Sequence, residues 1–210
     1  MEHTKIYHCK KISYKNRSVI VEGPVSANYL LTLKMSTELD AFRKPSEQHQ
    51  ALVDIAELPE GRIIITRDNE TIVGYVTFHY PDEMERWSQG NMQDLIELGA
   101  IEVANEYRLL GLGKEMICLA FIDSQMENVI VFTTEYYWHW DLKGSGLSIW
   151  DYRKLMEKLM KSVDMVWHAT DDPEICSHPA NCLMVRIGKE VPLESIEQFD
   201  RLRFQRRFMY

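Results

Sequence analysis

The chain has 210 residues, of which 45% are hydrophobic and 27% charged, and its formal net charge is -8 at pH 7. This length and composition indicate a globular protein with a full core. The acidic excess disfavours nucleic-acid binding, because neutralising phosphates needs a basic surface. No apolar run reaches about 18 residues, the length of a membrane-spanning helix, so we expect no membrane partner.

The four cysteines are scattered along the chain without a Cys-x-x-Cys pair. Such usage is typical of reduced thiols inside the cell. Cys176, His178 and Cys182 are metal-ligating types, but their spacing matches no standard zinc site, and we expect no metal. The first residues also lack the apolar core of a signal peptide. The simplest interpretation is a cytoplasmic protein.

Capping residues, prolines and β-branched runs predict five elements in the first part of the chain. Ser26 is a typical N-cap, Pro45 suits the first turn of a helix, and residues 68–70 suit a turn between strands. The expected elements are a strand at 19–22, a helix at 26–33, a helix that begins at 45 and stops at 59–61, and hairpin strands at 62–67 and 71–80.

Strand, glycine loop and helix follow one another in the middle of the chain. The apolar run Leu95–Val103 predicts a buried strand, Arg108–Lys114 is a basic loop with two glycines, and residues 114–125 read as a helix. Glycines let the backbone approach an anion, and the N–H groups and dipole of a helix start attract one. We therefore expect the loop to bind a phosphorylated ligand.

Backbone N–H groups and two cationic side chains are the expected partners of this anion. They come from one short stretch: Arg108, Gly111, Leu112, Gly113 and Lys114. Two common nucleotide motifs do not fit. A dinucleotide fingerprint needs a third glycine at position 116, and a P-loop needs four residues between its glycines. An ordinary tight turn with solvated basic side chains is the alternative.

The rest of the chain is expected to contain further strands and helices and one aromatic-rich segment. A strand at 129–134 follows the helix, and the strand–helix–strand order makes it parallel to Leu95–Val103. The further expected elements are an aromatic segment at 135–141, a flexible turn at 143–146, an amphipathic helix at 149–161, a strand at 165–169, a short helix within 179–188 and a last strand at 199–208.

The motif Arg-x-x-Gly-x-Gly after a strand, together with the element order over residues 19–134, resembles the GCN5-related N-acetyltransferase (GNAT) superfamily. Gly74 in the returning hairpin strand is also typical of that superfamily. The resemblance implies an α/β (α+β) fold with a mixed central sheet flanked by helices, as a single domain over 1–210 with an aromatic-rich insertion near 135–165. It also implies acetyl-CoA as the co-substrate, with its pyrophosphate in the glycine loop.

The same resemblance implies positions for the pantetheine arm. The backbone groups of Ile101 and Val103 are expected to bind it, at a bulge where the central strand leaves its neighbour. Asn181, at the start of what resembles the family's Asn-led helix, either bonds the pantetheine or caps that helix. The tyrosine that often stands in that helix is missing, so the general acid stays open among Tyr136, Tyr137 and Tyr152.

Two carboxylates interrupt the apolar central strand, Glu97 and Glu102. A carboxylate in such a strand costs free energy unless it is paired or near water, which makes both worth a functional interpretation. A lysine amine is almost wholly protonated at neutral pH, so its attack on a thioester needs a base. We favour Glu97 as that base, because some lysine-acetylating members of the superfamily keep a glutamate there, with Glu102 second. A structural role is the alternative for each.

Four further segments are similar to one member family, the bacterial acetoin-utilization acetyltransferase AcuA. They are residues 55–65, 135–143, 177–184 and 198–204, so the similarity covers nearly the whole chain. It implies a protein lysine acetyltransferase that uses acetyl-CoA. The target in that family is a lysine of acetyl-CoA synthetase, which acetylation inactivates.

The aromatic segment is expected to line the path of the lysine or to dock the protein target, since Tyr and Trp are enriched at binding hot spots. Its residues are Tyr136, Tyr137, Trp138 and Trp140. A core patch beneath the insertion is the alternative. Two other functions stay open: a small-molecule amine acetyltransferase, and a non-enzymatic acyl-CoA-binding regulatory protein.

Overall fold

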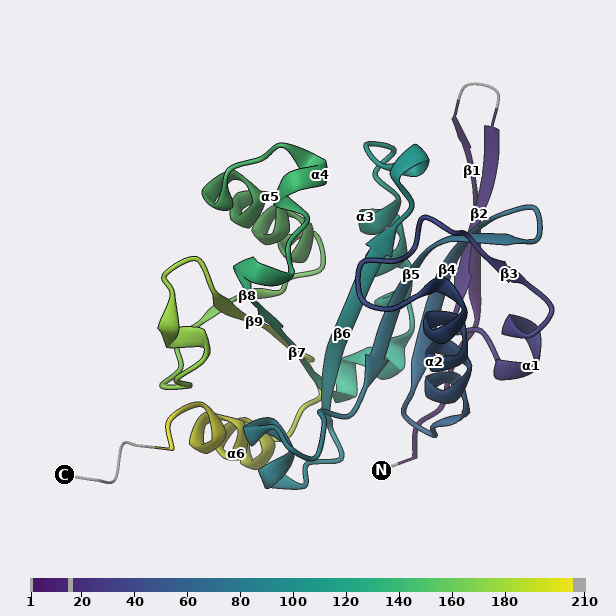
Figure 1. Cartoon of the computed structure of the whole chain (residues 1–210). Helices are drawn as coiled ribbons and strands as arrows, with labels where there is room; N and C mark the ends of the chain where they lie inside the picture. The colour runs from purple at the N-terminus through teal and green to yellow at the C-terminus, as the bar shows by residue number, and fades with distance from the viewer. Residues whose placement is uncertain (1, 15–16, 206–210) are drawn as a thin grey trace. The chain divides into compact units, whose positions relative to one another are not determined.

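The computed structural model describes residues 2–14 and 17–205, whose helices and strands are drawn in Figure 1. The chain forms two compact units, the first comprising Met1–His79 and Leu98–Met126 and the second Tyr80–Glu97 and Glu127–Tyr210. The described strands form a sheet that is mixed, as predicted, and they follow the order β1-β2-β4-β5-β6-β7-β9-β8, with β3 beside β5. The assignment of residues 1–210 to a single domain stays a prediction.

The first unit contains the hairpin and the glycine loop. Its elements are β1 (His8–Tyr14), β2 (Arg17–Gly23), α1 (Ala27–Leu30), β3 (Lys34–Met35), α2 (Pro45–Glu57), β4 (Arg62–Asp68), β5 (Thr71–His79), the last six residues of β6 (Leu95–Val103), the 3-10 helix η2 (Asn105–Tyr107) and α3 (Leu112–Ala120). Ser26 caps α1 by accepting from Tyr29 N, and β4 pairs with β5 antiparallel. The predicted hairpin and both predicted helices are confirmed, although α1 ends earlier than expected.

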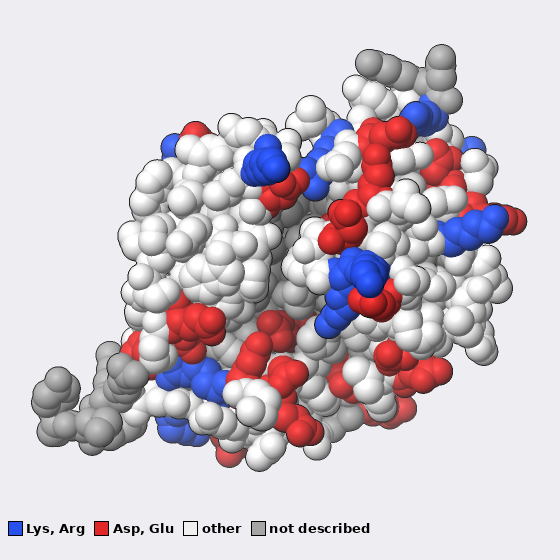
Figure 2. All heavy atoms as spheres, in the orientation of Figure 1, with Lys and Arg blue, Asp and Glu red and all other residues white. Residues whose placement is uncertain are grey.

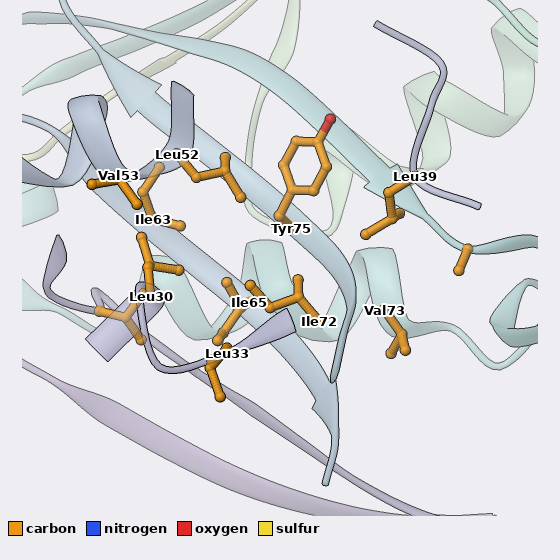
Figure 3. Packing of buried hydrophobic residues seen from close by; sticks show 12 residues of the cluster. Leu30, Leu33, Leu39, Leu52, Val53, Ile63, Ile65, Ile72, Val73 and Tyr75 are labelled. Carbon is orange, nitrogen blue, oxygen red and sulfur yellow. The ribbon is translucent and has the colours of Figure 1, made fainter. Parts of the chain in front are cut away.

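Buried aliphatic side chains on one face of β4 and β5 form the core of the first unit (Figure 3). Ile63, Ile65 and Ile72 are fully buried there, and helix α2 adds Leu52. Pro45 at the first turn of α2 and the extended backbone at Leu58 fix the two ends of this helix. Burying an aliphatic side chain of this size stabilises the fold by about 1.5–3 kcal/mol. The hairpin thereby becomes a rigid support for the strand beside it.

A buried ion pair attaches the segment before β1 to the first unit. Arg62 Nη1 lies 3.2 Å from Asp123 Oδ2, and both side chains are almost inaccessible to water. The N–H of Ile6 donates to the same carboxylate over 3.1 Å, and Arg62 Nη2 donates to Thr4 O over 2.8 Å. These bonds satisfy two buried charges that would otherwise be costly.

The second unit is built on the start of β6 and the strands that follow. Its elements are η1 (Arg86–Gly90), the first three residues of β6, β7 (Ile130–Glu135), η4 (Tyr137–His139), α4 (Leu142–Ser145), α5 (Ile149–Lys161), β8 (Val166–His168), η5 (Ile175–Ser177), β9 (Cys182–Ile187) and α6 (Leu193–Arg203). Another 3-10 helix, η3 (Ser124–Asn128), lies where the chain passes between the units. β6 pairs with β7 in parallel over Leu95–Glu97, as predicted.

Two predicted elements of the second unit are wrong. The short helix expected within residues 179–188 is strand β9, which pairs antiparallel with β7 and β8 and is buried over nearly its whole length. A short apolar run does not distinguish a helix from a strand buried on both faces. The strand expected at 199–208 is the end of α6, in which Ile196, Phe199 and Leu202 recur at helical spacing and pack into the core. Residues 206–208 lie outside the described part.

Three smaller differences follow from local chemistry. Strand β1 was not expected, because its largely exposed sequence shows little apolar alternation, and its full register with β2 holds it. Helix α3 ends at Ala120 rather than at 125, and 3-10 helix η3 follows. The turn expected at 143–146 is the short helix α4, which Asp141 caps by accepting from Gly144 N.

Candidate active site

The glycine loop presents the start of α3 without a capping side chain. Gly111 is the N-cap in the left-handed conformation, with φ of 75°, and the space where its Cβ would lie is open. The first intrahelical bond runs from Glu115 N to Gly111 O, so the N–H groups of Leu112, Gly113 and Lys114 have no acceptor inside the helix. Buried Leu112 anchors the helix start in the core. This geometry fits an anion, because free N–H groups and the helix dipole point at the same place.

The two basic residues of the loop differ in how they are held. Arg108 is half-buried, and its Nε donates to Val103 O at the end of β6 over 3.3 Å. Lys114, in the first turn of α3, is exposed. Arg108 is therefore oriented by the strand that precedes the loop, whereas Lys114 is free to follow a bound phosphate. Their roles in binding stay predictions.

Leu109 adopts a strained backbone conformation in the glycine loop. Its φ is 65° although it has a side chain, and that side chain is fully exposed. The left-handed conformation costs a residue with a Cβ about 1–2 kcal/mol, and glycine avoids this cost. We expect Leu109→Gly to stabilise the protein by about 0.5–1 kcal/mol after its extra unfolded-state entropy, measured by denaturant unfolding. Leu109→Ala keeps the strain and is the control, so equal stability of the two variants would refute the assignment.

Ile101 and Val103 direct their backbone groups away from β5. Ala104 N donates to Val73 O of β5 over 2.9 Å, and successive residues of a strand point their N–H and C=O groups to opposite edges. Ile101 and Val103 are an odd number of residues from Ala104, so their groups face the other edge of β6. That edge is where an extended ligand would add hydrogen bonds in the manner of a strand.

Glu102 is committed to the structure of the first unit. Its side chain is buried, accepts from Tyr75 OH over 2.6 Å, and accepts from Ala41 N over 2.9 Å. The bond from Tyr75 is made within the core that Figure 3 shows. These two bonds occupy acceptor sites of the carboxylate and hold the side chain in place. The arrangement favours the structural interpretation of this residue.

Glu97, in the part of β6 that belongs to the second unit, has a different environment. Only 8% of its surface is exposed, and no described residue donates a hydrogen bond to its side chain. Burial, followed by the charges of Glu85 and Asp82, raises the pKa of Glu97 to about 8. A carboxyl group with a pKa near the working pH is suited to proton transfer.

The aromatic segment is less exposed than its composition suggests. Trp138 is 45% exposed, whereas Tyr136, Tyr137 and Trp140 are each half-buried. Tyr136 stacks on Trp138 with 4.8 Å between ring centroids and also packs against the core. Trp140 Nε1 donates to Glu135 over 2.9 Å, and its ring stacks on Tyr152. One ring of the segment is thus presented to solvent and the others are partly covered, and a role of the segment in binding the target stays a prediction.

Asn181 is buried and holds loops together rather than capping a helix, since the expected helix is strand β9. Its Oδ1 accepts from Tyr137 N over 3.1 Å, and its Nδ2 donates to Glu174 O over 3.2 Å. These bonds position the start of η4. A bond from this side chain to pantetheine stays a prediction.

Three residues of interest were missed from the sequence. Glu135, at the end of β7, is buried, and burial raises its pKa to about 7 although it accepts from Trp140. It interrupts an apolar strand, so the signal that identified Glu97 would also have found it. The ring centroid of His178 lies 4.3 Å from that of Tyr137 and 6.3 Å from that of exposed Trp150. These two contacts join segments distant in sequence, and no local pattern indicates them.

The glycine loop, the parallel strands on each side of it and the outward-facing edge of β6 define an acetyltransferase of the GNAT class. The family model described as "Acetyltransferase (GNAT) family" matches residues 31–128, which include the loop. Enzymes of this class are acetyl-CoA-dependent N-acetyltransferases, and the chain is one of them.

Individual relatives show which family of this class the chain resembles. The chain is 63% identical to the acetoin utilization protein AcuA of Bacillus subtilis (strain 168) and 60% identical to that of Bacillus licheniformis, in each case over 210 residues and the full length of both chains. The crystal structure of an acetoin utilization protein from Exiguobacterium sibiricum 255-15 matches with a TM-score of 0.96 and 55% identity, covering 99% of this chain and 98% of that one. The chain belongs to the AcuA family of GNAT acetyltransferases.

Among residues 2–14 and 17–205, no helix is long and apolar enough to cross a membrane. In the same residues the four cysteines are free thiols, with Cys9 and Cys176 exposed and Cys182 buried. Burial, with the charge of Glu135, raises the pKa of Cys182 to about 12, so this thiol is neutral and unreactive.

Proposed function

We propose that the protein transfers the acetyl group of acetyl-CoA to a lysine of a folded protein, and that this protein is acetyl-CoA synthetase, as the family resemblance implies. The observation that carries the lysine assignment is Glu97, a buried carboxyl group with a raised pKa and no hydrogen-bond partner among the described residues. Such a group is suited to take the proton that a lysine must lose before it attacks.

The coenzyme is proposed to bind to the first unit. The N–H groups of Leu112, Gly113 and Lys114 would hold its pyrophosphate, with charge from Arg108, and the free edge at Ile101 and Val103 would hold its pantetheine arm. When bound, acetyl-CoA supplies a thioester that an amine can attack. Gly111 leaves room beside the helix start, because its Cβ position is open.

Glu97 is proposed as the general base. Its carboxylate takes a proton from the lysine ammonium, directly or through water, and the neutral amine then forms the new C–N bond as the C–S bond breaks. The departing thiolate takes up a proton from a general acid, which stays open among Tyr136, Tyr137 and Tyr152. The nitrogen still carries two protons after its attack and gives one to the phenolate of that acid, so that the amide and the free thiol leave and the acid is restored. Burial and three neighbouring carboxylates raise the pKa of Tyr136, so this phenol keeps its proton at neutral pH.

The protein target is proposed to dock on an aromatic surface formed by Tyr137, Trp138, Trp150 and His178. The rings form a continuous series, because Trp138 contacts Tyr137, Tyr137 contacts His178, and Trp150 lies against His178. The two tryptophans at its ends are 45% and 51% exposed. Rigid, partly exposed aromatic side chains of this kind are frequent anchors in protein interfaces.

Trp138→Ala is expected to raise KM for acetyl-CoA synthetase by about tenfold or more, because one aromatic anchor can carry about 2 kcal/mol of an interface. Steady-state kinetics with the synthetase as the varied substrate give this value, and calorimetry should show unchanged coenzyme affinity. Trp167→Ala is the matched control, because Trp167 on β8 is 56% exposed and lies outside the aromatic surface. Equal KM values for the two variants would remove the surface from the proposal.

One enzyme preparation tests whether the acceptor substrate is a protein or a small amine. The wild-type protein is incubated with acetyl-CoA and either purified acetyl-CoA synthetase or free polyamines and amino acids, and acetylated products are identified by mass spectrometry. We expect one or few modified lysines on the synthetase and a loss of its activity. Efficient acetylation of the free amines without labelled synthetase would establish the small-molecule alternative instead.

A further inference from the structure

Two acids of the second unit, buried Glu97 and half-buried Glu85, have carboxyl oxygens without a hydrogen-bond donor among the described residues. Glu97 lies in β6, and Glu85 is the residue directly before the 3-10 helix η1. Glu85 Oε2 is inaccessible to water and has no hydrogen-bond partner among the described residues, and the Glu97 side chain likewise accepts no bond from them. Buried carboxylates in protein interiors are normally paired, because an unpaired one costs free energy.

The surroundings of Glu85 are acidic rather than basic. The carboxylates of Asp82, Glu174 and Asp172 act on it electrostatically, and Glu85 and Asp82 act on Glu97 in turn. The phenol of Tyr136 belongs to the same group, since Glu174, Asp172 and Glu85 all act on it. In Figure 2, acidic side chains gather next to the position of α6, the helix that packs on η1 through Trp87 and Phe199.

The cation nearest in sequence does not neutralise Glu85. Arg86 extends instead to Asp171 over 2.7 Å and to Asp172 over 3.4 Å. Asp172 also accepts from the N–H groups of Glu174 and Ile175, so its carboxylate is fully engaged. Glu85 and Glu97 therefore remain as the two acids of the group whose side chains lack a donor among the described residues.

A lysine ammonium is a cation that suits this group, because it donates three hydrogen bonds and carries a single charge. Two carboxyl groups that lack donors can accept two of these bonds.

We propose that Glu85 is the binding residue for the acceptor amine: it accepts a hydrogen bond from the lysine ammonium beside Glu97, so that the lysine enters charged and gives its proton to Glu97. This inference rests on the proposed function and specifies its substrate class. The acceptor is a strongly basic primary amine that is cationic when it binds, rather than a weakly basic or neutral nucleophile. The charge of Asp82, which also acts on Glu97, strengthens the attraction.

Substrate binding then prepares the base. Without a cation, burial, followed by the charges of Glu85 and Asp82, raises the pKa of Glu97, so that this residue holds its proton at neutral pH. A bound ammonium favours the ionised form of each acid, because opposite charges stabilise each other at short range. Glu97 thus releases its proton to water as the lysine arrives, and the base becomes competent only when its substrate is present.

The test is Glu85→Gln, with Glu83→Gln as the matched control, since Glu83 is an exposed acid two residues away. We expect Glu85→Gln to raise KM for the synthetase by at least about tenfold, because removing one partner of a buried charge pair costs more than 1.4 kcal/mol. We also expect the rising limb of kcat/KM against pH to move to lower pH, because the charge that raises the pKa of Glu97 is gone. Coenzyme affinity should not change, and Glu83→Gln should behave as wild type.

Each outcome decides a different claim. Wild-type KM and an unshifted pH profile in a folded Glu85→Gln variant would overturn the assignment of Glu85, even if Glu97→Gln is inactive. Absence of lysine acetylation by the wild-type protein would instead overturn the proposed function itself. Should Glu85→Gln fail to fold, Asp82→Asn gives the same readout, with a smaller shift in the same direction expected. A pH profile of Asp82→Asn that matches wild type would then refute the proposal.

Discussion

Replacing Glu97 by glutamine is expected to lower kcat by about 10²-fold or more at neutral pH, the usual size of a general-base contribution. The amide keeps the shape of the side chain but takes no proton from the lysine. Coenzyme affinity should stay near the wild-type value, because the glycine loop belongs to the other unit. Single-turnover acetylation of acetyl-CoA synthetase measures the first quantity, and calorimetry with coenzyme A measures the second.

The same variant is expected to be more stable than wild type at alkaline pH. The pKa of Glu97 is raised from 4.5 to about 8 in the folded protein. Between these values the folded state holds a proton that the unfolded state has released, so the free energy of unfolding falls as pH rises through the window. Glutamine carries no charge and removes this loss. We expect a gain of a few kcal/mol at pH 8 and little gain at pH 4.5, by denaturant unfolding.

Glu102→Gln is the comparison variant. Tyr75 OH and Ala41 N both donate to this carboxylate, so an amide should weaken the first unit without removing catalysis. If Glu102→Gln abolishes turnover while Glu97→Gln retains it, Glu102 is the base. If both variants turn over normally, acetyl transfer depends on positioning or on another group.

Gly111→Glu is expected to weaken coenzyme A binding by at least about tenfold, because it places a negative charge where the pyrophosphate is proposed to lie. The φ of 75° at this position adds strain for any residue with a Cβ, about 1–2 kcal/mol. Calorimetry on the folded variant gives the affinity. Gly113→Glu, in the first turn of α3, should act in the same direction.

Gly146→Glu is the control that separates a negative charge at the glycine loop from the strain and added charge that the substitution would bring anywhere in the protein. Gly146 is also left-handed, with φ of 67°, and its Cβ position is also open. It is the C-cap of α4 in the second unit, so the substitution adds the same strain and the same charge there. We expect coenzyme affinity to be unchanged in this control. Equal affinities in Gly111→Glu and Gly146→Glu would contradict the proposed pyrophosphate site.

The parts of the fold that the sequence predicts well are those with strong local signals. β6 covers Leu95–Val103, the range expected from its apolar run, and α5 covers Ile149–Lys161, the range expected from its amphipathic spacing. β9 and α6 were mistaken because their apolar spacing is short and their state is decided by packing. Strand β1 has little sequence signal at all, since its pairing with β2 holds it.

Some residues of the candidate site can likewise be recognised in the sequence, and others cannot. The glycine loop and the two glutamates of β6 are visible in the sequence, because glycine spacing and a carboxylate in an apolar run are local patterns. Glu85 is invisible there, because it stands in a polar loop and two of the charges that act on it follow it by almost ninety positions. The difference between Glu97 and Glu102 also depends on partners far along the chain, so sequence alone left both as candidates.

The attachment of residues 4–6 to the buried ion pair sets an order of events during synthesis. The partner of Ile6 is Asp123, which is synthesised 117 residues later, and the partner of Thr4 is Arg62, which is synthesised 58 residues later. The segment before β1 is therefore made early and docks late, after the helix that precedes Asp123 has left the ribosome. A peptide tag joined close to Thr4 would have to be accommodated at that late step, so a spacer between tag and segment is advisable for expression.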